Sequence, residues 1–240
     1  MASERWEICW DFDDTLMPNT HLYHGCDWRC GLIICEALGT RSTRPMDVLA
    51  LQNKIDSESV KELGFGRERY PTSWVKAYQE LCGRIGAAED PAVSARLYET
   101  ARQFQYGPFE LHPQAMPALR AVQTDGHGLH LITVGDPVVQ NRKLDLTGIR
   151  PMFDSVTIVE RSKEQALADI ASRAPGRTVM IGDSKRSDIK PALDLGIHAI
   201  WIPSNTWSFA DLPDVRPDVT LQSIGELPAA LRKLVAAKPH

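Results

Sequence analysis

The sequence lacks a long apolar run, an excess of basic residues and a regular set of cysteines. No apolar segment approaches the ~20 residues that a membrane-spanning helix needs. Lys and Arg number 27 against 31 Asp and Glu, and no basic cluster stands out. A nucleic-acid-binding protein usually carries such a basic patch. These absences argue against membrane and nucleic-acid partners, and we expect a cytoplasmic protein.

Cysteine is scarce and odd in number. Most of the five cysteines lie within or beside apolar stretches, where a free thiol behaves as a small hydrophobe, so we expect no disulfide framework. His21, His24, Cys26 and Cys30 have the composition of a zinc site, but their spacing fits no common zinc pattern. We therefore interpret this stretch as a polar linker running into a helix, with a zinc site as the alternative.

Two regions of the chain differ in their patterns. Residues 18–108 indicate successive helices without a convincing strand, whereas strand-like and helix-like segments alternate from about residue 110 onward. Such alternation predicts a parallel sheet covered on both faces, which the early strand 6–10 completes. The predicted fold class is therefore α/β, with a doubly wound, Rossmann-like sheet from residues 1–17 and 109–240. Residues 18–108 are expected to form a smaller, all-helical domain.

A cluster of acids, Asp11-Phe12-Asp13-Asp14, follows the first predicted strand. Side chains alternate along an extended chain, so Asp11 and Asp13 point the same way while Asp14 points to the other face. Two like charges this close become tolerable beside a cation such as Mg²⁺, or if one acid holds a proton. A surface turn is the alternative, since Asp-rich segments often form turns. Later motifs favour a catalytic site.

Two later motifs also follow strands. Thr133 ends an apolar strand and could donate its hydroxyl to a phosphoryl oxygen, although a strand threonine is its plain alternative. Asp183, after Gly182, is a candidate metal ligand, and Asp188 in the next helical turn can assist it or simply cap that helix. Ligands bind beyond the carboxyl ends of parallel strands, so we expect these residues to converge with Asp11.

A basic residue is needed to neutralise a phosphoryl group during transfer. Ser162 and Gln165 form a capping-box pattern that places Lys163 at the first position of a helix, directly after strand 156–159. Lys163 is therefore preferred, and Arg161 in the same loop is the alternative. Lys143 is expected to lie on an exposed helix face.

Together these residues resemble the haloacid dehalogenase superfamily, most of whose members resemble phosphatases. Its Asp-x-Asp-x-Thr motif, its hydroxyl motif, its lysine and its Gly-Asp-x-x-x-x-Asp motif all have counterparts. The matching positions are Asp11, Asp13, Thr15, Thr133, Lys163, Gly182, Asp183 and Asp188. The helical region after the first motif is similar to the superfamily's cap, which closes over small substrates.

The resemblance implies a Mg²⁺-dependent phosphomonoesterase that acts on a small phosphorylated metabolite. Asp11 would form an aspartyl-phosphate, and Asp13 would protonate the leaving alcohol and then activate water. The metal set would be Asp11, Asp183, the carbonyl of Asp13 and, toward the shell, Asp188. An acid at Asp13 indicates the phosphatases rather than the dehalogenases. A phosphotransferase or mutase on this fold and a catalytically silent regulatory module are the alternatives.

Substrate contacts are harder to infer from the helical region. Arg67, Arg69 and Tyr70 lie in a segment flanked by glycine and are candidate contacts for an anionic substrate. Solvated loop positions are the alternative.

Overall fold

The computed structural model describes residues 4–39, 43–204 and 211–237. The chain divides into two compact units, one formed by Met1–Thr20 with Phe109–His240 and the other by His21–Pro108. The first unit holds the sheet, and the second holds helices that the chain inserts between the first two strands. The predicted α/β fold class with a helical insertion is confirmed.

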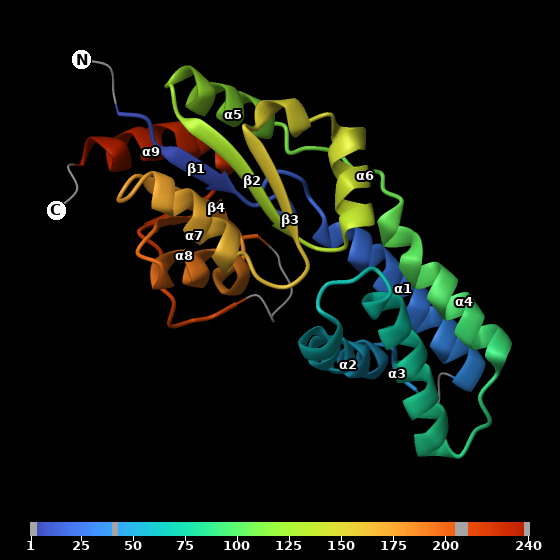
Figure 1. The fold of residues 1–240 in the computed structure, drawn as a ribbon. Coiled ribbons are helices and arrows are strands. Elements are labelled where there is room, and N and C mark those ends of the chain that lie inside the picture. Colours follow the sequence, from blue (N-terminus) through green and yellow to red (C-terminus); the bar gives the residue numbers. More distant parts are fainter. Residues whose placement is uncertain (1–3, 40–42, 205–210, 238–240) are drawn as a thin grey trace. The chain divides into compact units, whose positions relative to one another are not determined.

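The sheet has six parallel strands in the order β3-β2-β1-β4-β5-β6. Their bounds are β1 Glu7–Trp10, β2 Gly128–Val134, β3 Ser155–Val159, β4 Thr178–Gly182, β5 His198–Trp201 and β6 Val219–Thr220. The chain builds outward from β1 to β3 and then returns to β4 on the other side of β1 (Figure 1). Such a reversal leaves a crevice at the carboxyl ends of β1 and β4, where ligands bind in folds of this kind.

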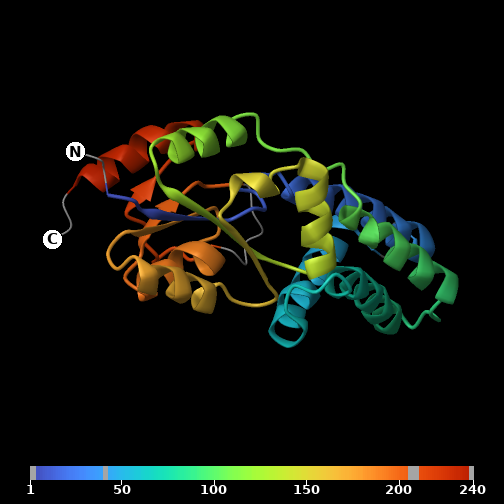
Figure 2. The same cartoon turned by 45° about the horizontal axis from the view of Figure 1, so that its top comes forward.

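Helices cover both faces of the sheet. Helices α5 (Ala115–Thr124) and α9 (Leu227–Ala236) lie over one face, and α7 (Glu164–Arg173) and α8 (Lys190–Asp194) lie over the other (Figures 1 and 2). Helix α6 (Pro137–Thr147) connects β2 to β3. On the face of α7 and α8, strand residues such as Cys9 and Met180 pack against Leu167 and Ile189. Burying each large apolar side chain contributes about 1.5–3 kcal/mol, which explains why these strands read as apolar runs.

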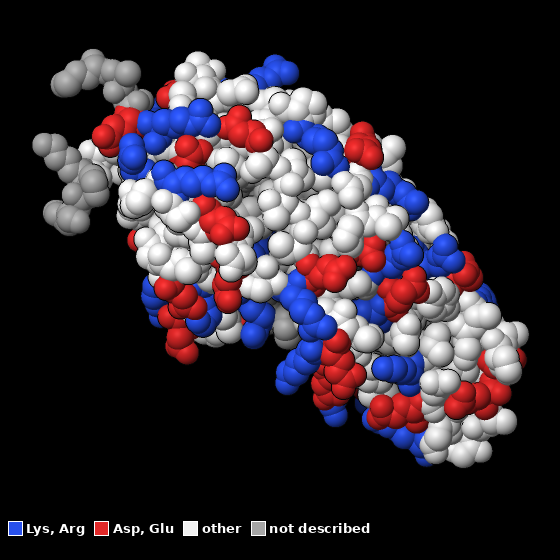
Figure 3. All heavy atoms as spheres, viewed as in Figure 1, with Lys and Arg blue, Asp and Glu red and all other residues white. Residues whose placement is uncertain are grey.

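The core of the second unit centres on large aromatic side chains, and its described residues form four α-helices. They are α1 (Thr20–Leu38), α2 (Pro45–Leu63), α3 (Arg69–Ile85) and α4 (Pro91–Ala101). Trp74 and Tyr78 of α3 are buried among apolar residues of α1 and α4. No helix among the described residues combines the length and apolarity needed to cross a bilayer. On the face shown in Figure 3, acidic and basic side chains are interspersed with uncharged surface.

The polar-linker interpretation of the segment around His21 is wrong, because α1 already begins at Thr20. Cys26 and Cys30 face the apolar core, whereas His21 and His24 are exposed. Within the described chain these four side chains do not form a group that could hold a metal. All five cysteines are free and buried.

The early start of α1 has a local cause in Asp14. Asp14 adopts a left-handed backbone (φ 57°), which Asp and Asn tolerate better than most residues. Its Oδ1 accepts hydrogen bonds from the N–H groups of Asn19 (2.8 Å) and Thr20 (2.9 Å), and its Oδ2 accepts one from the Thr20 hydroxyl (2.6 Å). These bonds satisfy donors that a helix start otherwise leaves without partners.

We expect Asp14→Ala to lower the free energy of unfolding by about 1–2 kcal/mol, because it removes the cap and strains the backbone. Asp14→Asn keeps an acceptor and the backbone preference, so it should cost less. Asp14→Gly separates the two effects, since it relieves strain without restoring the cap. Urea unfolding of the three variants measures this, and equal losses for Asn and Ala would contradict the capping role.

Candidate active site

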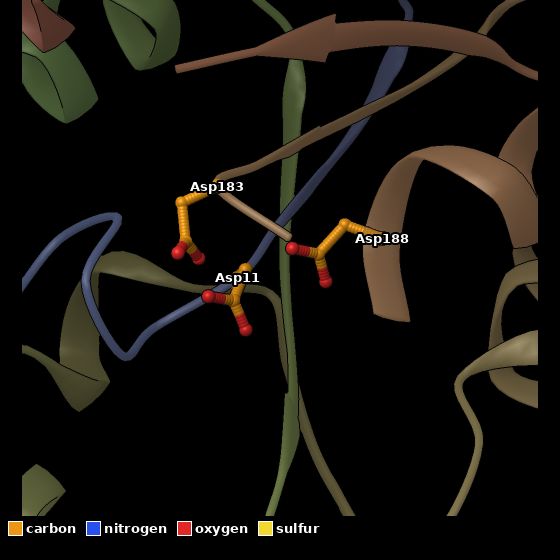
Figure 4. A group of neighbouring side chains, drawn as sticks. All are labelled: Asp11, Asp183 and Asp188. Atoms are coloured by element: carbon orange, nitrogen blue, oxygen red, sulfur yellow. The ribbon is translucent and has the colours of Figure 1, made fainter. Parts of the chain in front are cut away.

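Three buried carboxylates meet at the carboxyl ends of β1 and β4. Asp11 follows β1 and Asp183 follows β4, and the register that pairs Trp10 with Ile181 brings these two acids side by side. Asp188 joins them from a short π-helical turn, Lys185–Ile189. Oxygens of the three side chains lie within 4.8 Å of one another, and the carboxylates turn toward a common centre (Figure 4). The group can hold a metal ion.

Asp188 reaches this centre because the backbone at Gly182 carries no side chain. A Cβ at Gly182 would lie 2.3 Å from Asp188 Oδ2, so only glycine leaves room. The N–H of Ser184 donates to the same oxygen (2.9 Å). The helix predicted for this segment is instead a π-turn followed by α8. Pro191 lacks an N–H and so cannot donate the regular helical bond to Ser187, which favours the wider turn.

Lys163 supplies the positive charge of this cluster. Its Nζ donates to Asp11 Oδ1 and to Asp188 Oδ1 (2.6 Å), and its side chain is only 1% exposed. Arg161, the alternative, is exposed. The predicted capping box places the helix start and the partner of Ser162 wrongly. Helix α7 starts at Glu164, and the Ser162 hydroxyl accepts the N–H of Glu164 (3.2 Å).

The buried cluster contains more carboxyl groups than ammonium groups, and this imbalance affects their pKa values. Burial raises the pKa of Asp11 to about 7, against the opposing attraction of Lys163. Burial also raises the pKa of Asp183 well above its usual range, and the neighbouring Asp11 and Asp188 add to the effect. Burial alone would lower the pKa of Lys163, but the two acids that it contacts raise it instead. Three acids thus face one ammonium among oxygen donors, a set that suits a hard divalent cation such as Mg²⁺.

Two polar groups, one at the end of β5 and one in the segment after it, hold Asp183 in place, and sequence reasoning missed both. The Ser204 hydroxyl donates to Asp183 Oδ2 (2.7 Å), and Trp201 Nε1 donates to the Asp183 carbonyl (2.7 Å). The Thr15 hydroxyl lies 3.1 Å from Asp11 Oδ2 and 3.3 Å from Asp183 Oδ1. Ser204 follows β5, the strand that pairs with β4, and its place shortly after an apolar segment was the signal available in the sequence.

Asp13 lies in a separate environment. Lys143 Nζ is 2.8 Å from both of its carboxylate oxygens, and Gln140 Nε2 donates to Oδ2 (3.1 Å). The amide of Gln140 also donates to the hydroxyl of Thr133, which is fully buried. The expectation that Lys143 lies on an exposed face is wrong, because its side chain is 2% exposed. Gln140 and Lys143 are three residues apart, so they share one face of α6, and that face turns toward Asp13.

The three candidate substrate contacts lie in the helical unit. Arg69 is buried and forms an ion pair with Asp56, and the buried Tyr70 hydroxyl donates to Asp27. Arg67 is more exposed and pairs with Glu68 (3.3 Å). Arg69 and Tyr70 therefore use polar groups within their own unit, and contact of the three with substrate stays a prediction.

Solved structures with this fold include two that match nearly the whole chain. A haloacid dehalogenase-like hydrolase from Xanthomonas campestris is 25% identical, with a TM-score of 0.75 over 97% of this chain and 92% of its own. The HAD-hydrolase YfnB of Bacillus subtilis, whose structure has magnesium bound, is 21% identical with a TM-score of 0.64. That match covers 95% of this chain and 99% of YfnB, and at this identity it shows the shared fold alone.

Curated relatives are phosphatases of small metabolites. Glyceraldehyde 3-phosphate phosphatase of Methanopyrus kandleri is 25% identical over 238 residues, covering 92% of this chain and 97% of that protein. N-acylneuraminate-9-phosphatase of Rattus norvegicus is 29% identical over 170 residues, or 67% of this chain and 66% of its own length.

The family model for haloacid dehalogenase-like hydrolases matches residues 8–196, a stretch that contains Asp11, Asp13, Thr133, Lys163, Asp183 and Asp188. The resemblance inferred from the motifs is thereby confirmed. The chain belongs to the haloacid dehalogenase-like hydrolase family.

Proposed function

We propose that this protein is a Mg²⁺-dependent phosphomonoesterase acting on a small phosphorylated metabolite. The observation that carries the proposal is the separation of two neighbouring acids into two environments. Asp11 contacts Lys163 within the buried carboxylate cluster, whereas Asp13 contacts Lys143 and Gln140. Two acids in different surroundings suit two different tasks, nucleophile and proton donor.

In the first step an Asp11 oxygen attacks phosphorus. The new O–P bond makes an aspartyl-phosphate, and the bond from phosphorus to the substrate's alcohol oxygen breaks with its electron pair on that oxygen. Asp13 supplies the proton that the departing oxygen needs. Lys163, already bonded to Asp11, holds the nucleophile in one orientation and offsets charge on the phosphoryl oxygens.

In the second step water replaces the alcohol. Asp13, now a carboxylate, takes a proton from the water as it attacks phosphorus, and the O–P bond to Asp11 breaks to release phosphate. The buried Thr133 hydroxyl lies in the network that holds Asp13 and is our candidate donor to a phosphoryl oxygen. Both acids return to their starting states.

The carboxylates of Asp11, Asp183 and Asp188 and the carbonyl of Asp13 are the candidate ligands for Mg²⁺. When bound, the ion supplies positive charge that offsets the phosphate and the buried acids. The magnesium-bound relative of the same fold supports the choice of metal. Because Asp188 also contacts Lys163, we assign it mainly to orienting that lysine and the metal shell.

We further propose that the helical unit acts as a cap that selects the substrate. It is inserted directly after Asp11 and Asp13, between β1 and β2. Arg67 is the most accessible of its three candidate contacts. The relatives that act on glyceraldehyde 3-phosphate and N-acylneuraminate 9-phosphate support a small metabolite as the substrate class.

A panel of phosphorylated metabolites assayed with Mg²⁺ and with EDTA tests this function. We expect Mg²⁺ to be required for phosphate release and to raise the melting temperature, because the ion binds the folded state and offsets its buried carboxylates. Asp183→Asn should lower Mg²⁺ affinity at least about tenfold by calorimetry or thermal shift. Equal release in EDTA would contradict the metal role, and release that depends on an added acceptor alcohol would indicate a phosphotransferase instead.

A further inference from the structure

Lys143 is a buried ammonium whose nearest charged partner is Asp13. Its Nζ lies 2.8 Å from both Asp13 oxygens and 5.9 Å from the centroid of the Phe109 ring. The Lys143 side chain is almost fully buried, whereas that of Asp13 is 23% exposed. Burying a lysine costs solvation free energy and side-chain entropy, so a buried lysine needs a compensating role for its charge.

Gln140 fixes the same carboxylate from one helical turn away. Its amide donates to Asp13 Oδ2 and to the Thr133 hydroxyl, so Gln140 links these two side chains in one hydrogen-bond network. Gly135 packs closely against the Gln140 side chain, since a Cβ there would lie 3.0 Å from Gln140 Cγ. Helix α6 therefore presents two donors to one acid, whereas Asp11 and Asp188 bond to a different lysine, Lys163.

Asp11 and Asp13, the two acids of the first motif, thus form ion pairs with different lysines. Lys163, from the loop after β3, contacts Asp11 and Asp188, while Lys143, from α6, contacts Asp13. A residue can therefore be changed in one network without removing a direct contact in the other.

We propose that Lys143, together with Gln140, is a positioning residue that holds Asp13 for proton transfer to the leaving alcohol. This inference rests on the proposed function. As the P–O bond breaks, the proton moves from Asp13 to the departing oxygen, and Lys143 neither gives nor takes a proton. Its role is to keep the carboxyl in the one orientation from which that transfer is short.

Leaving-group dependence tests this role. An alkyl leaving group needs protonation, whereas p-nitrophenolate departs readily without it. The ratio kcat/KM reports steps through alcohol release, so it should be measured for glycerol 3-phosphate and p-nitrophenyl phosphate. We expect Lys143→Met to lower kcat/KM for glycerol 3-phosphate about 10- to 100-fold and for p-nitrophenyl phosphate less than about threefold. Gln140→Leu should change the two substrates in the same direction by a smaller factor.

Two comparisons make the result decisive. Leu144→Ala removes buried packing from the same helix and leaves both donors to Asp13, Lys143 and Gln140, in place. It should therefore change kcat/KM for both substrates by one factor. In an Asp13→Asn background, Lys143→Met should alter the ratio between the substrates by less than about twofold, because the residue acts through Asp13. If Lys143→Met instead resembles Leu144→Ala, or if its effect persists without Asp13, the inference is overturned.

The same experiment separates this inference from the proposed function. Asp13→Asn should itself lower kcat/KM for glycerol 3-phosphate by about 10²- to 10⁴-fold and affect p-nitrophenyl phosphate far less. If the unaltered protein releases phosphate from no member of the panel, or if Asp13→Asn does not discriminate between alkyl and p-nitrophenyl leaving groups, the proposed function fails. If Asp13→Asn discriminates and neither Lys143→Met nor Gln140→Leu does, only the positioning role fails.

Discussion

Asp11→Asn should reduce turnover at least about 10⁴-fold while the fold stays intact, because the amide is nearly isosteric with the carboxylate but is not a nucleophile. The remaining partners of Lys163, including Asp188 at 2.6 Å, keep the ammonium paired. The measurement is kcat on the best substrate of the panel, with circular dichroism as the check on folding. Phosphoenzyme should not accumulate on this variant.

The matched control is Asp14→Asn, which makes the same chemical change three residues along the chain. Asp14 caps α1 and is not one of the three clustered carboxylates, so this variant should keep activity within about threefold. Comparable losses in both variants would remove the assignment of Asp11 as nucleophile. Unimpaired turnover by Asp11→Asn would do so as well.

Asp11→Asn should also change the stability of the folded protein. The pKa of Asp11 is raised to about 7 from 3.8, mainly by burial, so between these values the folded protein binds more protons than the unfolded chain. Stability contributed by this group is therefore lost as pH rises from about 4 to about 7. Without metal, Asp11→Asn should unfold at a higher urea concentration than the unaltered protein at pH 8, and at a similar one at pH 4.

Lys163→Met should impair both activity and stability. It leaves Asp11 and Asp188 buried without their ammonium partner, a loss of about 3–5 kcal/mol in the absence of metal. Loss of charge beside the phosphoryl group should lower kcat by about 10²- to 10³-fold. Urea unfolding and steady-state kinetics measure the two effects.

Arg161→Met is the matched control for this prediction. It removes a cation from the same loop, but Arg161 is exposed, so kcat should change less than about threefold and stability by less than about 0.5 kcal/mol. Mg²⁺ should raise the melting temperature of Lys163→Met more than that of the unaltered protein, because it replaces a missing positive charge. A crippling effect of Arg161→Met alone would mean that the basic residue was assigned to the wrong position.

Local patterns predicted the fold class and the strand ends well. Strands β1 and β4 are short, mainly buried apolar runs, and each is followed directly by an acid, Asp11 and Asp183. Both features are visible in the sequence, because burial of a central strand on two faces demands apolar residues. The errors in element bounds have local causes that hydrophobic periodicity does not report, namely a side-chain cap and a proline. The start of α1 depends on a cap from Asp14, and the turn before α8 is π-helical rather than α-helical.

The sequence by itself determined that Asp11, Asp13 and Asp183 follow apolar strands of a parallel sheet, whose carboxyl ends lie at one edge. Only the tertiary structure decided which basic residue forms an ion pair with which acid. Lys143 occurs in a helix whose sequence does not separate an apolar face from a polar one. Its burial follows from how α6 places it against Asp13, which lies beyond the end of β1. Periodicity describes an element in isolation, whereas ion pairing at a buried acid depends on the rotation and depth of a neighbouring element, which packing sets.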